Sequence, residues 1–163
     1  MKPKPDFLAI FQTLAKHQVD FIVVGGVGAV LQGAPISTFD LDLVHSRTGE
    51  NVDRLLLALE ALDARYRATG ARETKPARSH LLSPGHRLLM TTFGPLDLLG
   101  AIGQGKGYME LLDQTVEMEV GSSLNVRVLD LATLIKVKEE VGHAKDRAVL
   151  AILRRTLEEK SKS

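Results

Sequence analysis

Hydrophobic and polar positions alternate along the chain with two different periods, and this predicts both helices and strands. In four segments the apolar residues fall three and four positions apart, the spacing of one face of an amphipathic helix. Asp6 and Asp130 are placed to cap the first and third of these segments, and Gly142 is placed to end the third. The helices expected on this basis cover residues 6–18, 51–66, 131–141 and 145–158.

Short apolar runs bounded by glycine, proline or polar residues predict the strands. Residues 27–32 can form only a short helix, because Gly33 and Pro35 end it. A turn followed by a second short helix is expected over residues 104–113. The predicted strands are residues 21–24, 39–44, 88–93, 96–99, 115–120 and 125–129, of which the last two resemble a hairpin.

This order of elements predicts one α+β domain over residues 1–163, with no internal repeat and no linker. Its core is expected over about residues 19–129, followed by a pair of C-terminal helices over 130–159. The chain is long enough to bury a core, and its 44% apolar and 25% charged residues are ordinary values for a globular protein.

Composition excludes several classes of function. Only 4% of the residues are aromatic and none is Trp, which argues against an extended surface for stacking nucleic-acid bases. The absence of cysteine excludes disulfides and zinc sites built from thiolates. No apolar run approaches the length of a membrane span, and the first residues lack the apolar segment of a signal peptide. A cytoplasmic protein without a membrane partner is therefore expected.

Positive charge is concentrated in residues 65–87, although the formal net charge of the chain is only +1. Six basic residues and one acid, Glu73, give this basic segment a net charge of +5. Proline and glycine punctuate residues 68–87, which predicts a mobile loop that is either simply solvated or in contact with a polyanion such as RNA. The six cations are Arg65, Arg67, Arg72, Lys75, Arg78 and Arg87.

Two carboxylates interrupt the apolar run TFDLDLV, where Asp40 and Asp42 alternate with aliphatic or aromatic neighbours. Residues i and i+2 of a strand point to one face, so these carboxylates are expected side by side. Like charges at that spacing repel, and strands disfavour Asp. A divalent cation, Mg²⁺ or Mn²⁺, would remove the repulsion, and this predicts a metal site.

A glycine-rich stretch, VVGGVGAVLQG, lies between the first two predicted strands. It does not fit a dinucleotide-binding motif, because Leu31 stands where the third glycine is required and the helix is too short for a crossover. In the alternative interpretation, Gly25 and Gly26 let backbone N–H groups approach a phosphate. A strand, a turn, a short helix and a returning strand would bring this turn beside Asp40 and Asp42.

The combination of Val24-Gly25-Gly26 with Asp40-Leu41-Asp42-Leu43 resembles the signature of the DNA polymerase beta-type nucleotidyltransferase superfamily. Among its members the chain is most similar to small stand-alone enzymes, the minimal nucleotidyltransferases and the toxins of abortive-infection systems. The resemblance implies a nucleotidyltransferase fold, a mixed β-sheet backed by helices. It also implies a third carboxylate on a later strand, and Asp97 in FGPLDLLG matches that position. By this resemblance Asp40, Asp42 and Asp97 are the catalytic residues and the ligands of two metal ions.

The resemblance extends to the C-terminal helices, where Lys138 and the pair Lys145-Asp146 occupy the places of basic residues in such proteins. One position departs from the pattern, because Ile36 stands where relatives commonly carry an arginine. Lys138 or an arginine of the basic segment is expected to replace it. The expected nucleotide-binding residues are Gly25, Gly26, Thr38, Lys138 and Lys145.

The activity implied by this resemblance is the metal-dependent transfer of a nucleoside monophosphate from a nucleoside triphosphate to a hydroxyl acceptor, with release of pyrophosphate. The acceptor can be a protein, an RNA 3′ end or a small molecule. The alternative is a catalytically silent module of the same fold that acts as an antitoxin-like protein with a cognate partner. Ile36 favours this alternative, whereas three retained acids disfavour it. Simple RNA binding through the basic segment is a third interpretation.

Overall fold

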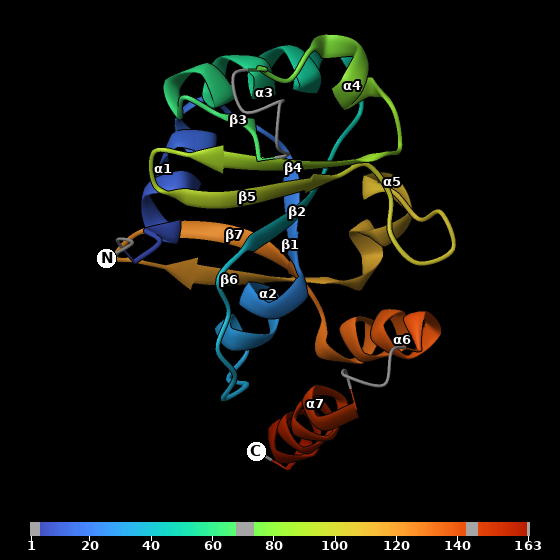
Figure 1. Cartoon of the computed structure of the whole chain (residues 1–163). Coiled ribbons are helices and arrows are strands. Elements are labelled where there is room, and N and C mark those ends of the chain that lie inside the picture. The colour runs from blue at the N-terminus through green and yellow to red at the C-terminus, as the bar shows by residue number, and fades with distance from the viewer. Residues whose placement is uncertain (1–3, 68–73, 143–146, 163) are drawn as a thin grey trace.

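A mixed β-sheet forms the centre of the structure (Figure 1). The computed structural model describes residues 4–67, 74–142 and 147–162. Within this part of the chain seven strands pair in the order β3-β4-β5-β2-β1-β7-β6. Strand β2 is antiparallel to β1 and parallel to β5, and β1 is parallel to β7. The strands are β1 Phe21–Val24, β2 Leu41–His45, β3 Arg65–Tyr66, β4 His86–Thr91, β5 Gly94–Leu99, β6 Thr115–Val120 and β7 Leu124–Leu129.

Helices cover both faces of the sheet, each over its own hydrophobic cluster. One cluster joins α1, α3 and α4 to side chains such as Leu41 and Leu43 of β2. The other joins α5, α6, α7 and part of α2 to side chains such as Val44. Successive side chains of β2 therefore point to opposite faces, as strand geometry requires. The helices are α1 Phe7–Lys16, α2 Gly25–Leu31, α3 Gly49–Ala61, α4 Arg78–Leu82, α5 Tyr108–Leu111, α6 Leu131–Val141 and α7 Arg147–Ser161, with a 3₁₀ turn at Leu112–Gln114.

The α+β fold predicted from the sequence is confirmed, including the mixed sheet and the C-terminal helix pair α6 and α7. Both predicted caps are present. The Asp6 carboxylate accepts a hydrogen bond from the Ala9 N–H at 3.1 Å, and the Asp130 carboxylate accepts one from the Thr133 N–H at 2.8 Å. Gly142 ends α6 in the left-handed conformation. In the described part of the chain, no helix is both long and apolar enough to cross a membrane.

The basic segment is more ordered than its composition indicated. The loop predicted over residues 68–87 contains α4 and the first residues of β4, whereas residues 68–73 lie outside the described part. The Leu81 side chain of α4 is fully buried, and the His45 ring on β2 donates a hydrogen bond to the Leu81 carbonyl oxygen at 2.8 Å. One buried leucine and one buried histidine thus anchor a segment that looks polar overall.

Two predicted boundaries also shift. The helix expected to reach residue 66 ends at Ala61, because Asp63 adopts a positive φ of 51° and β3 then pairs with β4. The strand expected from residue 39 begins at Leu41 and continues to His45. Asp40 therefore precedes β2 and is exposed.

Candidate active site

Three adjacent strands bring the glycine turn and two acids together. Val24 at the end of β1 pairs with Asp42 on β2, and Asp42 pairs with Asp97 on β5. The residues on either side of each acid, such as Leu41 and Leu96, point into the cluster beneath α1 and α3. Asp42 and Asp97 consequently share the opposite face of the sheet, the face covered by α6 and α7.

Both glycines of the turn lie too close to signature residues to carry a side chain. Gly25 has a φ of 67°, and a Cβ atom there would overlap the Asp42 carboxylate. A Cβ atom at Gly26 would lie 2.8 Å from Oγ1 of Thr38. Thr38 in turn donates a hydrogen bond to the Asp40 carbonyl oxygen at 3.3 Å. The GG dipeptide is thus fitted to the loop and strand that carry the acids.

Asp42 and Asp97 form a closely coupled carboxyl pair. Burial raises the pKa of Asp42 to about 7, and the charge of Asp97, a hydrogen bond with Asp97 and the charge of Asp40 act in the same direction. The charge of Arg67 opposes them. Asp97 is itself only 8% exposed. One proton near neutral pH therefore relieves the repulsion within the pair.

Asp40 does not join this pair as closely as strand alternation predicted. It is exposed and precedes the first residue of β2, so the i, i+2 geometry of a strand does not extend to it. Among the residues described, no group of three or more His, Cys, Asp or Glu side chains is placed to hold a metal ion. The structure brings together Asp42 and Asp97 and leaves Asp40 at the rim.

The donor set nevertheless fits a divalent cation. Oxygen ligands are those that Mg²⁺ prefers, and two carboxylates that share a proton can exchange it for a metal ion. The missing side chain at Gly25 lets the Asp42 carboxylate lie directly against the backbone of the glycine turn. Asp42 and Asp97 would hold such an ion, with Asp40 nearby.

Arg67 is the site residue that sequence reasoning identified only as one cation among six. Its Nη2 donates to Oδ1 of Asp97 at 2.6 Å, and its Nη1 donates to the Leu89 carbonyl oxygen at 2.9 Å. The Arg67 side chain is 24% exposed. The sequence carried the signal that an arginine of the basic segment could serve the site, but the choice of Arg67 depends on the pairing of β3, β4 and β5.

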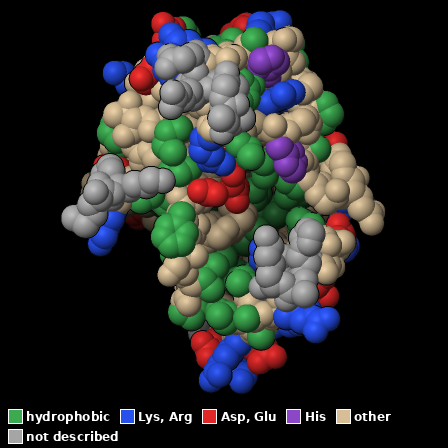
Figure 2. All heavy atoms as spheres, in the orientation of Figure 1, with side chains coloured by type: hydrophobic (Ala, Val, Ile, Leu, Met, Phe, Trp, Pro, Cys, Tyr) green, Lys and Arg blue, Asp and Glu red, His purple; other side chains and the backbone are tan. Residues whose placement is uncertain are grey.

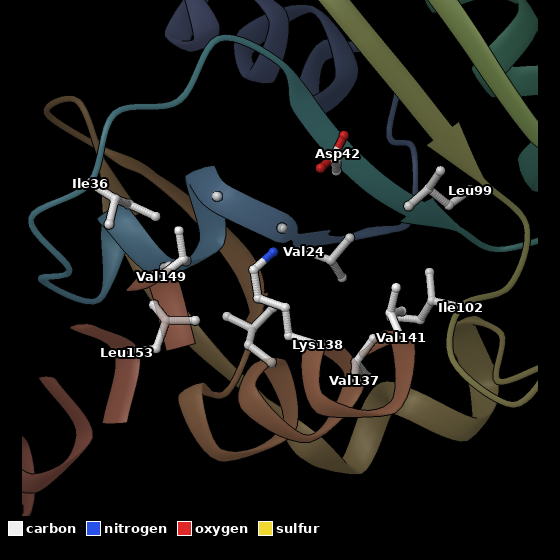
Figure 3. Close-up of a pocket in the computed structure, with 14 residues that line it drawn as sticks. Val24, Ile36, Asp42, Leu99, Ile102, Val137, Lys138, Val141, Val149 and Leu153 are labelled. Atoms are coloured by element: carbon white, nitrogen blue, oxygen red, sulfur yellow. The ribbon is translucent and has the colours of Figure 1, made fainter. Parts of the chain in front are cut away.

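A cavity of about 210 Å³ lies between the glycine turn and the helices α6 and α7 (Figure 3). Figure 2 shows acidic side chains near the centre of this face, above a hollow lined by hydrophobic side chains. The charged lining residues are Asp42 and Lys138, and the Lys138 side chain points from α6 toward the turn (Figure 3). The aliphatic lining residues are Val24, Ala29, Ile36, Leu99, Ile102, Leu134, Val137, Val141, Val149 and Leu153.

The other residues singled out from the sequence lie in different places. Ile36, the departure from the family pattern, forms part of the aliphatic wall of the cavity. Thr38 lies against Gly26, as described above. Lys145 and its neighbour Asp146 lie outside the described residues.

Comparison with known proteins finds similarity to a solved structure. No protein-family model matches the chain, and no curated protein matches it by sequence. The fold is similar to the crystal structure of a Thermotoga maritima protein that is provisionally assigned as a nucleotidyltransferase. The two chains are 16% identical, with a TM-score of 0.58 over 94% of this chain and 91% of the other. At this identity the likeness shows a shared fold, in agreement with the fold that the glycine and acid signature implied.

Proposed function

We propose that the chain is a small metal-dependent nucleotidyltransferase that transfers a nucleoside monophosphate from a nucleoside triphosphate to a hydroxyl group and releases pyrophosphate. The observation that carries this proposal is the pairing of Asp42 with Asp97 directly beside Gly25. Two carboxylates that repel each other, next to backbone open to a phosphate, are what a phosphate-bound cation requires. The fold shared with a provisionally assigned nucleotidyltransferase also supports this proposed function.

The nucleotide would occupy the cavity with its phosphates toward the turn. The phosphates would lie against Gly25 and Gly26, which line the cavity, and Lys138 would supply a positive charge from α6. The aliphatic wall suits the nucleoside portion, whose flat base can pack on it without hydrogen bonds. Lys145 is proposed as a further nucleotide-binding residue on the basis of the family resemblance alone.

The reaction joins the acceptor oxygen to the α-phosphorus and breaks the bond from that phosphorus to the β-phosphate. When bound, Mg²⁺ or Mn²⁺ would polarise the phosphate oxygens and neutralise their charge. In this proposal Asp97, which pairs with Asp42, would accept the proton of the attacking hydroxyl group, and Lys138, which lines the cavity, would stabilise the charge of the departing pyrophosphate. Asp42 and Asp97 would hold such a cation beside the phosphates.

The acceptor is proposed to be a protein hydroxyl, an RNA 3′ end or a small molecule. The net charge of +5 over residues 65–87 favours a polyanion among these. A toxin-like role with a cognate partner protein follows from the family resemblance. These finer assignments share one test, because the labelled product identifies the acceptor.

The test is transfer of label from each of the four α-³²P-labelled nucleoside triphosphates, with Mg²⁺ or Mn²⁺, to total cell RNA and protein. We expect metal-dependent label on one acceptor class and none with Asp42→Asn. Glu119→Gln, an exposed change on β6, serves as the matched control. If the wild-type chain neither binds nucleotide nor transfers label, the proposed function is refuted.

A second function, a catalytically silent binding module with an antitoxin-like role, is favoured by one observation. Ile36 lines the cavity at the position where relatives commonly carry an arginine, and an aliphatic side chain cannot bind a phosphate. This function predicts nucleotide binding without transfer of label. The same labelling experiment, run beside a binding measurement, separates the two functions.

A further inference from the structure

The guanidinium group of Arg67 is bonded to a carboxylate oxygen of Asp97 that would otherwise be free to bind a metal ion. Its Nη2 lies 2.6 Å from Oδ1 of Asp97, a short distance even for a charge-assisted hydrogen bond. Asp97 is the acid that the proposed function assigns to the acceptor side of the site. A permanent cation at this oxygen repels a divalent ion that approaches the same atom.

Arg67 is held by more than its ion pair. Its backbone N–H donates to the Leu88 carbonyl oxygen at 3.1 Å, and its Nη1 donates to the Leu89 carbonyl oxygen at 2.9 Å. These two bonds attach both ends of the residue to β4. Displacement of the guanidinium from Asp97 would therefore also disturb its bond to the Leu89 carbonyl oxygen.

With Arg67 bonded to Asp97, the free carboxylate oxygens also fall short of what two metal ions require. A two-metal site places its ions about 4 Å apart and shares carboxylates between them. Asp40 is exposed and lies before β2, and the described residues contain no cluster of three acids or histidines suited to a metal. While one oxygen of Asp97 is bonded to Arg67, the oxygens that remain on Asp42 and Asp97 serve one ion.

We propose that Arg67 is a built-in cation of this site, so that the chain binds one divalent metal ion with its nucleotide where a two-metal enzyme binds two. This inference rests on the proposed function and adds a positioning residue to it. The single ion lies on the Asp42 side with the phosphates. The guanidinium of Arg67 balances the charge of Asp97 on the acceptor side.

The test counts metal ions directly. Mn²⁺ is titrated into the full chain with a saturating α,β-methylene nucleoside triphosphate, and free Mn²⁺ is measured by electron paramagnetic resonance. We expect one tightly bound Mn²⁺ per wild-type chain and two per Arg67→Met chain, because the neutral side chain frees the Asp97 oxygen. Arg67→Lys retains a cation and is expected to return the count to one.

Arg65→Met is the matched control, because Arg65 lies on β3 two residues before Arg67 and pairs with the exposed Asp63 at 3.1 Å. It is expected to bind one Mn²⁺, and circular dichroism reports whether each variant folds. Two tightly bound Mn²⁺ ions in the wild-type chain would overturn the inference and leave the proposed function standing. A count that stays at one in a folded Arg67→Met chain would also overturn it. If the wild-type chain shows no nucleotide-dependent Mn²⁺ binding, both the proposed function and this inference fail.

Discussion

At the scale of single residues, the Asp42 carboxyl group is the clearest source of measurable effects. Its pKa is raised from 3.8 to about 7, so the folded chain favours the protonated form. The stability that this proton provides is fully present below pH 3.8 and is lost as the pH rises through 7. Without metal, the folded state above pH 7 therefore carries the charge of the half-buried Asp42 carboxylate beside Asp97.

Asp42→Asn is expected to raise the melting temperature at pH 8 in metal-free buffer, by a stability gain on the order of 1 kcal/mol or more. The same change is expected to abolish metal-dependent nucleotide binding, because the amide cannot hold the cation. Differential scanning calorimetry with and without EDTA measures the first effect. A lower melting temperature at pH 8 would show that Asp42 is a structural hydrogen-bonding residue instead.

Metal affinity is expected to depend on pH through the same carboxyl group. A cation must displace the proton of Asp42, so the apparent affinity for Mg²⁺ should rise by up to about tenfold per pH unit below 7 and level off above it. Isothermal titration calorimetry between pH 5.5 and 8.5 measures this profile. An affinity that is constant over that range would argue against Asp42 as a ligand.

Several site residues could be predicted from the sequence because they belong to one short motif. Gly25 and Asp42 follow from residue type and spacing, Asp97 follows from the family resemblance, and the structure brings these three together. Arg67 could not be singled out, because its partner is set by the edge of the sheet where β3 pairs with β4. Asp40 was expected beside Asp42, but the first residue of a strand is decided by hydrogen bonds that no pattern of hydrophobicity specifies.

At the scale of elements, α6 and α7 complete the cavity that the sheet alone would leave open. They contribute side chains such as Val137, Lys138 and Val149 to its wall. Among the lining residues that the structure describes, only Asp42 and Lys138 have side chains with a hydrogen-bonding group. Aliphatic side chains cannot form hydrogen bonds with the polar groups that distinguish the four bases. The affinities for ATP, GTP, CTP and UTP are therefore expected to lie within about tenfold of one another.

Val149→Phe is expected to fill part of this cavity and to weaken nucleoside triphosphate binding about tenfold. Because Val149 is only partly buried, the larger ring should leave the fold intact. Val30→Phe is the control, since Val30 lies on α2, is 38% exposed and does not line the cavity. Fluorescence titration with a labelled nucleotide compares the two variants. Equal affinities would place the nucleoside outside the cavity.

The contact between β2 and α4 predicts a second pH effect. His45 is 1% exposed, its Nε2 donates to the Leu81 carbonyl oxygen, and its Nδ1 has no partner. Burial lowers the pKa of His45 below 6.5, so the folded chain resists protonation. Stability is full above pH 6.5 and is lost at about 1 kcal/mol per pH unit as the pH falls toward the folded pKa.

His45→Gln is expected to remove this loss while its amide still donates to the Leu81 carbonyl oxygen. The measurement is the free energy of unfolding in urea at pH 7.0, 6.0 and 5.5, compared between wild type and variant. The difference between the two proteins isolates His45 from Asp42, whose protonation acts in the opposite direction. Parallel pH profiles would show that His45 does not titrate in this range.

The helices and strands were predicted well where apolar periodicity is long, as in α1 and α6. They were predicted poorly where two or three tertiary contacts determine the secondary structure. Segment 78–82 reads as part of a charged loop, yet α4 forms there because Leu81 is buried against the sheet. A hydrogen bond of 2.7 Å between the Tyr66 hydroxyl and the His80 ring adds to this anchoring. Such tertiary contacts are not visible in a local window of sequence.

At the scale of the whole molecule, the positive charge of the basic segment is partly balanced within the fold. Arg67 pairs with Asp97 in a largely buried position, whereas Arg78 pairs with Asp53 at 2.8 Å on the surface. An exposed pair of this kind contributes at most about 1 kcal/mol and is screened by salt. Arg78 can therefore exchange its partner for a polyanion, whereas Arg67 is retained by the site.

The parallel pairing of β2 with β5 has a consequence for the order of folding events. Asp42 and Asp97 are separated by more than fifty residues, so they meet only after a long crossover has closed. A chain that has formed only the β1–β2 hairpin holds no complete site, and a divalent ion gains nothing by binding to it. Mn²⁺ is therefore expected to lower the unfolding rate constant and to leave the refolding rate constant unchanged in stopped-flow experiments. Acceleration of refolding by Mn²⁺ would instead mean that the crossover closes before the rate-limiting barrier, and the ion would then act as a nucleus for the fold.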